Sequence, residues 1–250
     1  TRNPLVAPDI VGVSGGAAVA AIAVIVFGWP GFLLGPAACL GGLVAGAALA
    51  WLASGGGATG RTLVLVGIGV AAVAEALVGY LVTRGDLLEV QQATIWLVGS
   101  LYAASWADAA LLGAALAIAV PVMVLLGRPM LAMELGDETA AGLGVRTDVT
   151  RRALLVLAVV LASIAVATTG PIAFVAFLAP NIGRRLARTS GAGTIVAACT
   201  VGALLVLAAD IVARRIVAPT ELPVGIVTIL LGAPYFLYLL ARSDRVGVAA

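Results

Sequence analysis

The sequence predicts an all-α, polytopic membrane protein, and three observations point to that fold class. Of the 250 residues, 62% are hydrophobic and 10% are charged, and the mean hydropathy is +1.18. A soluble fold of this length could not bury so much apolar surface. Apolar stretches long enough to cross a bilayer recur along the chain. All fourteen basic residues are arginine and the formal net charge is +2, so nothing indicates nucleic-acid binding.

The apolar stretches define the expected transmembrane helices. A bilayer core of about 30 Å needs about 20 apolar residues per helix, and each stretch that meets this length is bounded by Gly, Pro or charge. In chain order, the eight predicted spans are residues 10–28, 31–52, 62–83, 107–126, 149–168, 171–187, 193–213 and 224–241. Segment 90–105 is shorter and more polar and carries Trp96 and Tyr102, so we expect a surface or re-entrant helix there.

The distribution of arginine predicts the orientation in the membrane. When the eight spans alternate, eleven arginines fall on one side and three on the other. Positive charge is enriched in cytoplasmic connections, so the first side is predicted to be cytoplasmic. The three arginines on the outer side are Arg84, Arg214 and Arg215.

Ionisable residues are scarce within the predicted spans. Only Glu75 lies well inside one, and the chain contains no histidine. Asp108, Asp210 and Glu221 lie near outer helix ends, where capping or pairing with the outer arginines is sufficient to explain them. Carriers driven by protons or sodium usually bury several carboxylates or histidines, so we expect the energy for transport to come from a separate component.

The longest cytoplasmic connection, residues 127–148, is predicted to contain a short helix. Gly136 precedes Asp137 and Glu138, whose charges suit a helix N-terminus, and Gly144 suits a C-terminal stop. These positions predict a helix of about two turns.

This short helix has the features of a docking element. Ala140 and Ala141 keep one face slim, and Leu135 and Leu143 supply apolar anchors for a groove in a partner protein. An amphipathic helix lying on the membrane surface is the alternative interpretation.

The sequence offers no site for catalysis, metal or cofactor. Cys39 and Cys199 lie within apolar runs and are interpreted as small buried residues. The glycine-rich run at 55–60 joins two spans and lacks the lysine of a nucleotide-binding loop. This chain is therefore not expected to be an enzyme or to hydrolyse ATP itself. A secondary transporter or channel that works without ATP, or a membrane scaffold, are the rival classes.

Several segments resemble one family of membrane permeases. The matching segments are RNPLVAPDIVGVSGGA at the start, WLVGSLYAASW at 96–106, residues 135–144, GPIAFVAFLAP at 170–180 and ELPVGIVTILLGAPYFLYLL at 221–240. Together they resemble permease subunits of the iron-chelate and cobalamin ABC importers of the FecCD type, over essentially all 250 residues. One departure is Asn181, where the family commonly has histidine.

The resemblance implies a bacterial cytoplasmic-membrane assembly with several partners. It implies one permease domain over residues 1–250 that pairs with a second permease subunit, two cytoplasmic ATPases and an extracytoplasmic binding protein. The ATPases would grip residues 135–144, where the expected coupling residues are Leu135, Gly136, Asp137, Glu138, Ala141, Leu143 and Gly144. The family has ten spans per subunit, so the resemblance also implies an N-terminal pair of spans before Thr1.

The resemblance also implies a docking residue and a class of cargo. In the family, an arginine seven residues before the ELP-x-G motif receives acidic residues of the binding protein. In this sequence that arginine is Arg214, and Arg215 is expected to assist it. Ferric siderophore is the commonest cargo that the resemblance implies, and haem and cobalamin are the alternatives.

Overall fold

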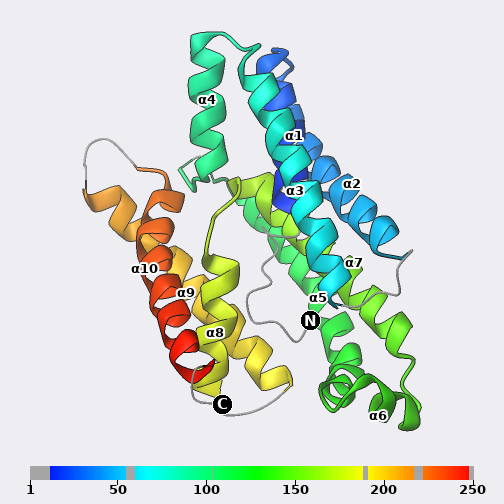
Figure 1. The fold of residues 1–250 in the computed structure, drawn as a ribbon. Helices are drawn as coiled ribbons and strands as arrows, with labels where there is room; N and C mark the ends of the chain where they lie inside the picture. The colour runs from blue at the N-terminus through cyan, green and yellow to red at the C-terminus, as the bar shows by residue number, and fades with distance from the viewer. Residues whose placement is uncertain (1–11, 55–59, 103, 188–190, 217–221, 248–250) are drawn as a thin grey trace.

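The computed structural model describes residues 12–54, 60–102, 104–187, 191–216 and 222–247. These residues fold into helices joined by short connections (Figure 1). The helices are α1 (Val13–Val26), η1 (Gly31–Leu33), α2 (Leu34–Ser54), α3 (Gly60–Val82), α4 (Leu87–Val98), α5 (Trp106–Glu134), α6 (Asp137–Gly142), α7 (Thr147–Thr169), α8 (Val175–Ala187), α9 (Ala192–Ile216) and α10 (Val224–Gly247). The predicted all-α fold class is confirmed.

Seven of the eight predicted spans coincide with apolar helices. Five of these helices are long and apolar enough to cross a membrane: Gly31–Leu52, Val64–Val82, Trp106–Glu134, Thr147–Thr169 and Gly193–Ile216. Two shorter apolar helices, Val13–Val26 and Val224–Leu237, match the first and last predicted spans.

The predicted span at 171–187 is wrong in its length. Helix α8 has 13 residues and begins only at Val175, so it is about 20 Å long and cannot cross a bilayer core of about 30 Å by itself. The preceding segment is not helical, because Gly170 and Phe174 have positive φ angles of 70° and 65°. Hydropathy does not register such a backbone break.

The boundary between the fourth span and the long connection also differs from the prediction. The span was expected at 107–126, but α5 continues to Glu134 through Arg128 and Pro129. The helix also continues through Gly127. The non-helical part of the 127–148 connection is therefore shorter than expected. At its other end α5 begins with a capping box between Ser105 and Asp108, as expected for an acidic residue at a helix start.

Segment 90–105 forms the short helix that was expected, shifted toward the N-terminus. Helix α4 ends at Val98 and packs against α1 and α3. Its Ala93 is fully buried beside Ile22 and Ile25 of α1.

Small residues allow the spans to approach closely. Glycines spaced four residues apart favour such close packing of helices. A methyl group added at Gly16 of α1 would collide with the Gly41 carbonyl of α2. On the other face of α2, Gly42 lies against Ser163 of α7, and Gly46 lies against Val159. Helix α2 is thus held between α1 and α7 through backbone approaches that larger side chains would prevent.

Three segments that are far apart in the sequence meet near the ends of α7 and α10 that the arginine distribution predicts to lie outside. The Ser100 N–H donates to the Thr169 carbonyl at 2.9 Å, and the Gly225 N–H donates to the Gly99 carbonyl at 3.2 Å. We call this meeting of residues 98–101, 169–172 and 224–225 the outer junction. It connects the end of α4, the end of α7 and the start of α10.

Candidate functional site

Helix α6 lies between α5 and α7 at one end of the molecule (Figure 1). Gly136 precedes it with a φ of 116°, and the Ala140 N–H donates to the Gly136 carbonyl at 2.9 Å. At the other end Gly144 has a φ of 84°, and its N–H donates to the Ala141 carbonyl at 2.9 Å. The Val145 N–H donates to the Ala140 carbonyl at 3.0 Å, which completes a Schellman closure. The predicted short helix and its glycine stop are therefore confirmed.

The residues of α6 and its flanks differ in exposure. Ala140 is fully buried against the rest of the protein, whereas Ala141 is exposed. Leu135 and Leu143, which flank the helix, are 68% and 65% exposed. Both leucine side chains are therefore accessible to another protein surface.

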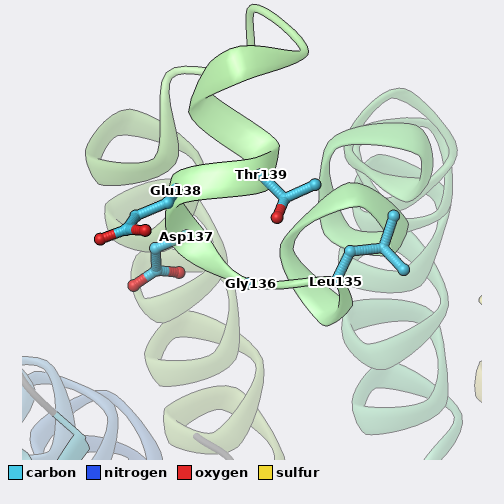
Figure 2. Close-up of a pocket in the computed structure, with 5 residues that line it drawn as sticks. All are labelled: Leu135, Gly136, Asp137, Glu138 and Thr139. Atoms are coloured by element: carbon cyan, nitrogen blue, oxygen red, sulfur yellow. The ribbon is translucent and has the colours of Figure 1, made fainter.

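A shallow groove of about 390 Å³ runs along the start of α6 and is lined by Leu135, Gly136, Asp137, Glu138 and Thr139. Figure 2 shows the two carboxylates of this group pointing to one side of the helix and Leu135 lying on the other side. The negative charges stand at the helix N-terminus, where the helix dipole favours them.

An ion pair joins α6 to the following span. The Arg151 Nη2 of α7 donates to Asp137 Oδ2 at 2.8 Å, and the two side chains are 33% and 58% exposed. This contact spans fourteen positions in the sequence, and sequence reasoning missed it because several arginines lie near α6 in the chain. It connects the start of α6 directly to α7.

Exchanging the two charges should show how much this ion pair contributes to positioning α6. An Arg151→Glu variant places two carboxylates together. We expect the ATP-driven uptake that the resemblance implies to fall roughly threefold, since a partly exposed pair contributes up to about 1 kcal/mol. The double variant Arg151→Glu with Asp137→Arg should recover most of the uptake. A double variant no better than Arg151→Glu alone would contradict this role.

Two of the three outer arginines, Arg214 and Arg215, lie in the last turn of α9, at the opposite end of the spans from α6 (Figure 1). The Arg214 Nε donates to Asp210 Oδ2 at 2.9 Å, and its Nη2 donates to the Leu101 carbonyl at 3.4 Å. The Arg214 side chain is still 42% exposed, and Arg215 is exposed. Pairing of Arg214 with Asp210, which the sequence left open, is therefore present, while Glu221 lies outside the described residues.

The two cysteines lie on α2 and α9. Over the described ranges, no group of three or more His, Cys, Asp or Glu side chains is placed to hold a metal ion. Cys39 is half-buried, but Cys199 is exposed, so the expectation that both are buried is wrong for Cys199. An apolar run on a spanning helix need not face the protein interior, because the lipid-facing side is equally apolar.

Comparison with known proteins gives a consistent result over nearly the whole chain. Residues 1–242 match the FecCD transport family. The achromobactin transport system permease protein CbrC of Dickeya dadantii is 41% identical over 97% of this chain and 70% of its own length. The Fe(3+)-citrate import system permease protein YfmE of Bacillus subtilis is 40% identical over 98% of this chain and 74% of its own length.

A solved structure supports the fold independently. An inward-facing conformation of a metal-chelate type ABC transporter superposes with a TM-score of 0.87 at 27% sequence identity. The match covers 96% of this chain and 78% of that one.

Proposed function

Because the chain belongs to the FecCD transport family, we propose that it is the permease subunit of an importer whose cargo is a ferric siderophore. At the coarser level the assignment is direct: the chain is a multi-pass protein of the bacterial inner membrane and a permease of an ABC importer for siderophore, citrate, haem or cobalamin. The siderophore proposal is carried by the 41% identity to the achromobactin permease.

The proposed assembly contains three kinds of partner protein. A second permease subunit completes the pathway, two ATPase subunits bind on the cytoplasmic side, and a binding protein delivers cargo from outside. This chain, as one permease domain over residues 1–250, supplies no ATP-hydrolysing residue of its own. Its proposed role is to bind the partner proteins and to change conformation when the ATPases do.

In this proposal α6 is the element that receives force from the ATPase. The exposed leucines that flank it enter an apolar cleft of the ATPase, and the acidic start of α6 meets basic or amide groups at the cleft edge. The residues assigned to this contact are Leu135, Gly136, Asp137, Glu138, Ala141, Leu143 and Gly144. The exposure of Leu135 and Leu143 supports this assignment, and the ion pair to Arg151 gives the movement a route into α7.

Arg214 and Arg215 are proposed to receive acidic side chains of the binding protein. Because the Arg214 guanidinium already contacts Asp210, an incoming carboxylate would have to share or replace that partner. Such an exchange is compatible with a docking contact that forms and breaks in each transport cycle, since exposed ion pairs contribute little net free energy.

Charge reversal at Arg214 should weaken docking of the binding protein. We expect Arg214→Glu to raise the Kd roughly tenfold, because it removes an attraction and adds repulsion toward an acidic partner. Arg215→Glu serves as the comparison, with a smaller expected effect. The Kd is measured by titrating the purified binding protein onto the importer in nanodiscs at two salt concentrations. An unchanged Kd for Arg214→Glu would remove the docking role.

Reconstitution tests the proposed function as a whole. The permease, its ATPase and its binding protein are placed in lipid vesicles, and uptake of ⁵⁵Fe-labelled siderophore is compared with uptake of haem and cobalamin. We expect uptake of the siderophore that depends on ATP and on the binding protein. Uptake of haem or cobalamin alone would overturn the siderophore assignment, and uptake without ATP would overturn the coupling mechanism.

A further inference from the structure

Glu75 is the one ionisable residue of the chain well inside a predicted span, and the proposed coupling and docking sites do not use it. It lies on α3, two residues from the middle of the apolar helix Val64–Val82, which places it about 3 Å from the midpoint. Its side chain is exposed. A carboxylate at this depth is costly next to lipid, so this side of α3 is expected to face water or a polar partner.

The surroundings of Glu75 form an open groove of about 450 Å³, a volume within the range of small-molecule sites. Ser14 and Gly15 of α1 form one wall, and Glu75 lies on the α3 wall. The remaining walls include Leu97 of α4 together with Pro171 and Ala173. Three helices and one non-helical segment therefore meet around the carboxylate.

The non-helical segment gives an independent reason to expect water in this groove. Pro171 and Ala173 belong to the stretch between α7 and α8 where the chain is not helical. Such backbone does not face lipid, since its N–H and C=O groups would be unsatisfied there, and it occurs where it is covered by protein or lines a water-filled cavity. Because it shares the groove with Glu75, the two polar features lie in the same part of the protein.

The chemistry of the groove limits what can bind there. A carboxylate accepts hydrogen bonds and does not donate them, and no basic side chain lines the groove among the described residues. The groove therefore favours cationic or hydrogen-bond-donating groups on an otherwise apolar surface and disfavours anionic ones. On the proposed import function, the molecule that enters from an aqueous pathway is the cargo.

We infer that the Glu75 groove is a subsite of the import pathway that takes a cationic or hydrogen-bond-donating part of the cargo, and that Glu75 determines this preference. The inference rests on the proposed function for the identity of the occupant. The hydration and charge preference of the groove can be measured without any transported cargo.

The test uses Ala71→Cys, one helical turn before Glu75 in the same groove, in a chain that also carries Cys39→Ala and Cys199→Ala. The complete importer in membrane vesicles is treated with two water-soluble methanethiosulfonates, one with a trimethylammonium group and one with a sulfonate group. We expect both reagents to modify Ala71→Cys, the cationic one faster. Adding Glu75→Gln should lower the ratio of the cationic reagent's rate to the anionic reagent's rate roughly fivefold or more. Glu75→Asp should preserve this ratio.

Val73→Cys is the matched control. Val73 is 62% exposed, and it lies two positions from both Ala71 and Glu75, about 160° around the axis of α3 from each of them. It should react slowly with both reagents. Ser14→Cys repeats the measurement from α1 if the variant in α3 inserts poorly. Equal reactivity of Ala71→Cys and Val73→Cys, or a rate ratio that Glu75→Gln leaves unchanged, would overturn the inference. Reactivity that appears only after detergent separates the two permease subunits would assign the groove to the subunit interface instead.

This test and the reconstitution fail separately. If the groove still reacts faster with the cationic reagent but the vesicles import no chelate, the cargo assignment is removed and the hydrated groove remains. Normal ATP-driven uptake with no effect of Glu75 on the labelling rates would remove only the present inference.

Discussion

ATP-driven uptake is expected to fall at least about tenfold when Leu143 is replaced by aspartate, while the permease still inserts into the membrane. Leu143 is 65% exposed at the C-terminal end of α6, so the substitution disturbs little inside the chain itself. Burying a leucine in a partner cleft contributes about 2 kcal/mol, and a buried carboxylate without a partner costs more. A loss of about 2 kcal/mol corresponds to roughly thirtyfold weaker docking.

The measurement follows ATP hydrolysis and uptake of labelled iron chelate in the same vesicles. The ATPase should keep its basal activity but lose stimulation by the loaded binding protein. Leu186→Asp is a matched control, because Leu186 is also 65% exposed and lies near the inner end of α8. It should leave uptake within about twofold, which is the effect of an ordinary surface substitution. Normal uptake by Leu143→Asp would contradict the docking role of α6.

The position of α6 could be predicted because its limits are set by local chemistry. Gly136 and Gly144 both adopt positive φ angles, and acidic residues at 137 and 138 favour a helix start next to the first glycine. These signals depend on neighbours in the sequence. The predicted spans succeeded for a similar reason, since the length of an apolar run is a local property.

The features that sequence reasoning missed depend on tertiary structure or backbone geometry. The break before α8 rests on positive φ at Gly170 and at Phe174, and a phenylalanine gives no warning of such a conformation. The ion pair between Asp137 and Arg151 required knowing how α6 folds back onto α7. The groove around Glu75 required knowing that α1, α3 and the 170–174 segment meet.

The outer junction shows why separate motifs belong together. Gly99, Gly170 and Gly225 come from three of the segments that resembled the permease family, and the structure brings all three to one place. A methyl group at Gly99 would lie 2.6 Å from the Pro171 carbonyl oxygen, and one at Gly170 would lie 2.6 Å from the Trp96 carbonyl oxygen. The backbone segments therefore touch directly, with glycine at each contact. Arg214 also reaches this region through the Leu101 carbonyl, so the proposed docking residue contacts the same connection.

Among the glycines that the structure describes, Gly225 is expected to cause the largest loss of stability when it is replaced with alanine. A methyl group at this position would overlap the Val98 carbonyl oxygen. The Gly225 N–H also donates to Gly99 at 3.2 Å, so α10 cannot move away without losing that hydrogen bond. Overpacking of a close contact costs roughly 1–3 kcal/mol, and occasionally more, where backbone must shift. We expect a clear drop in the unfolding temperature of the permease in detergent, measured by the fluorescence of its tryptophans.

Gly69→Ala separates this steric effect from the general effect of replacing glycine in a helix. Gly69 lies within α3, and apart from its chain neighbours and the adjacent backbone of α3, no atom lies within 4 Å of a methyl group built there. Alanine is the better helix former by about 1 kcal/mol, so this control should unfold at the same or a slightly higher temperature. If the Gly225→Ala and Gly69→Ala variants had the same unfolding temperature, the contact between α10 and the 98–101 segment would not be part of the stable structure. If Gly225→Ala unfolds earlier, as expected, the outer end of α10 is fixed to the connection that Arg214 contacts, and a binding protein docked there would act on α10 and α4 through a rigid contact.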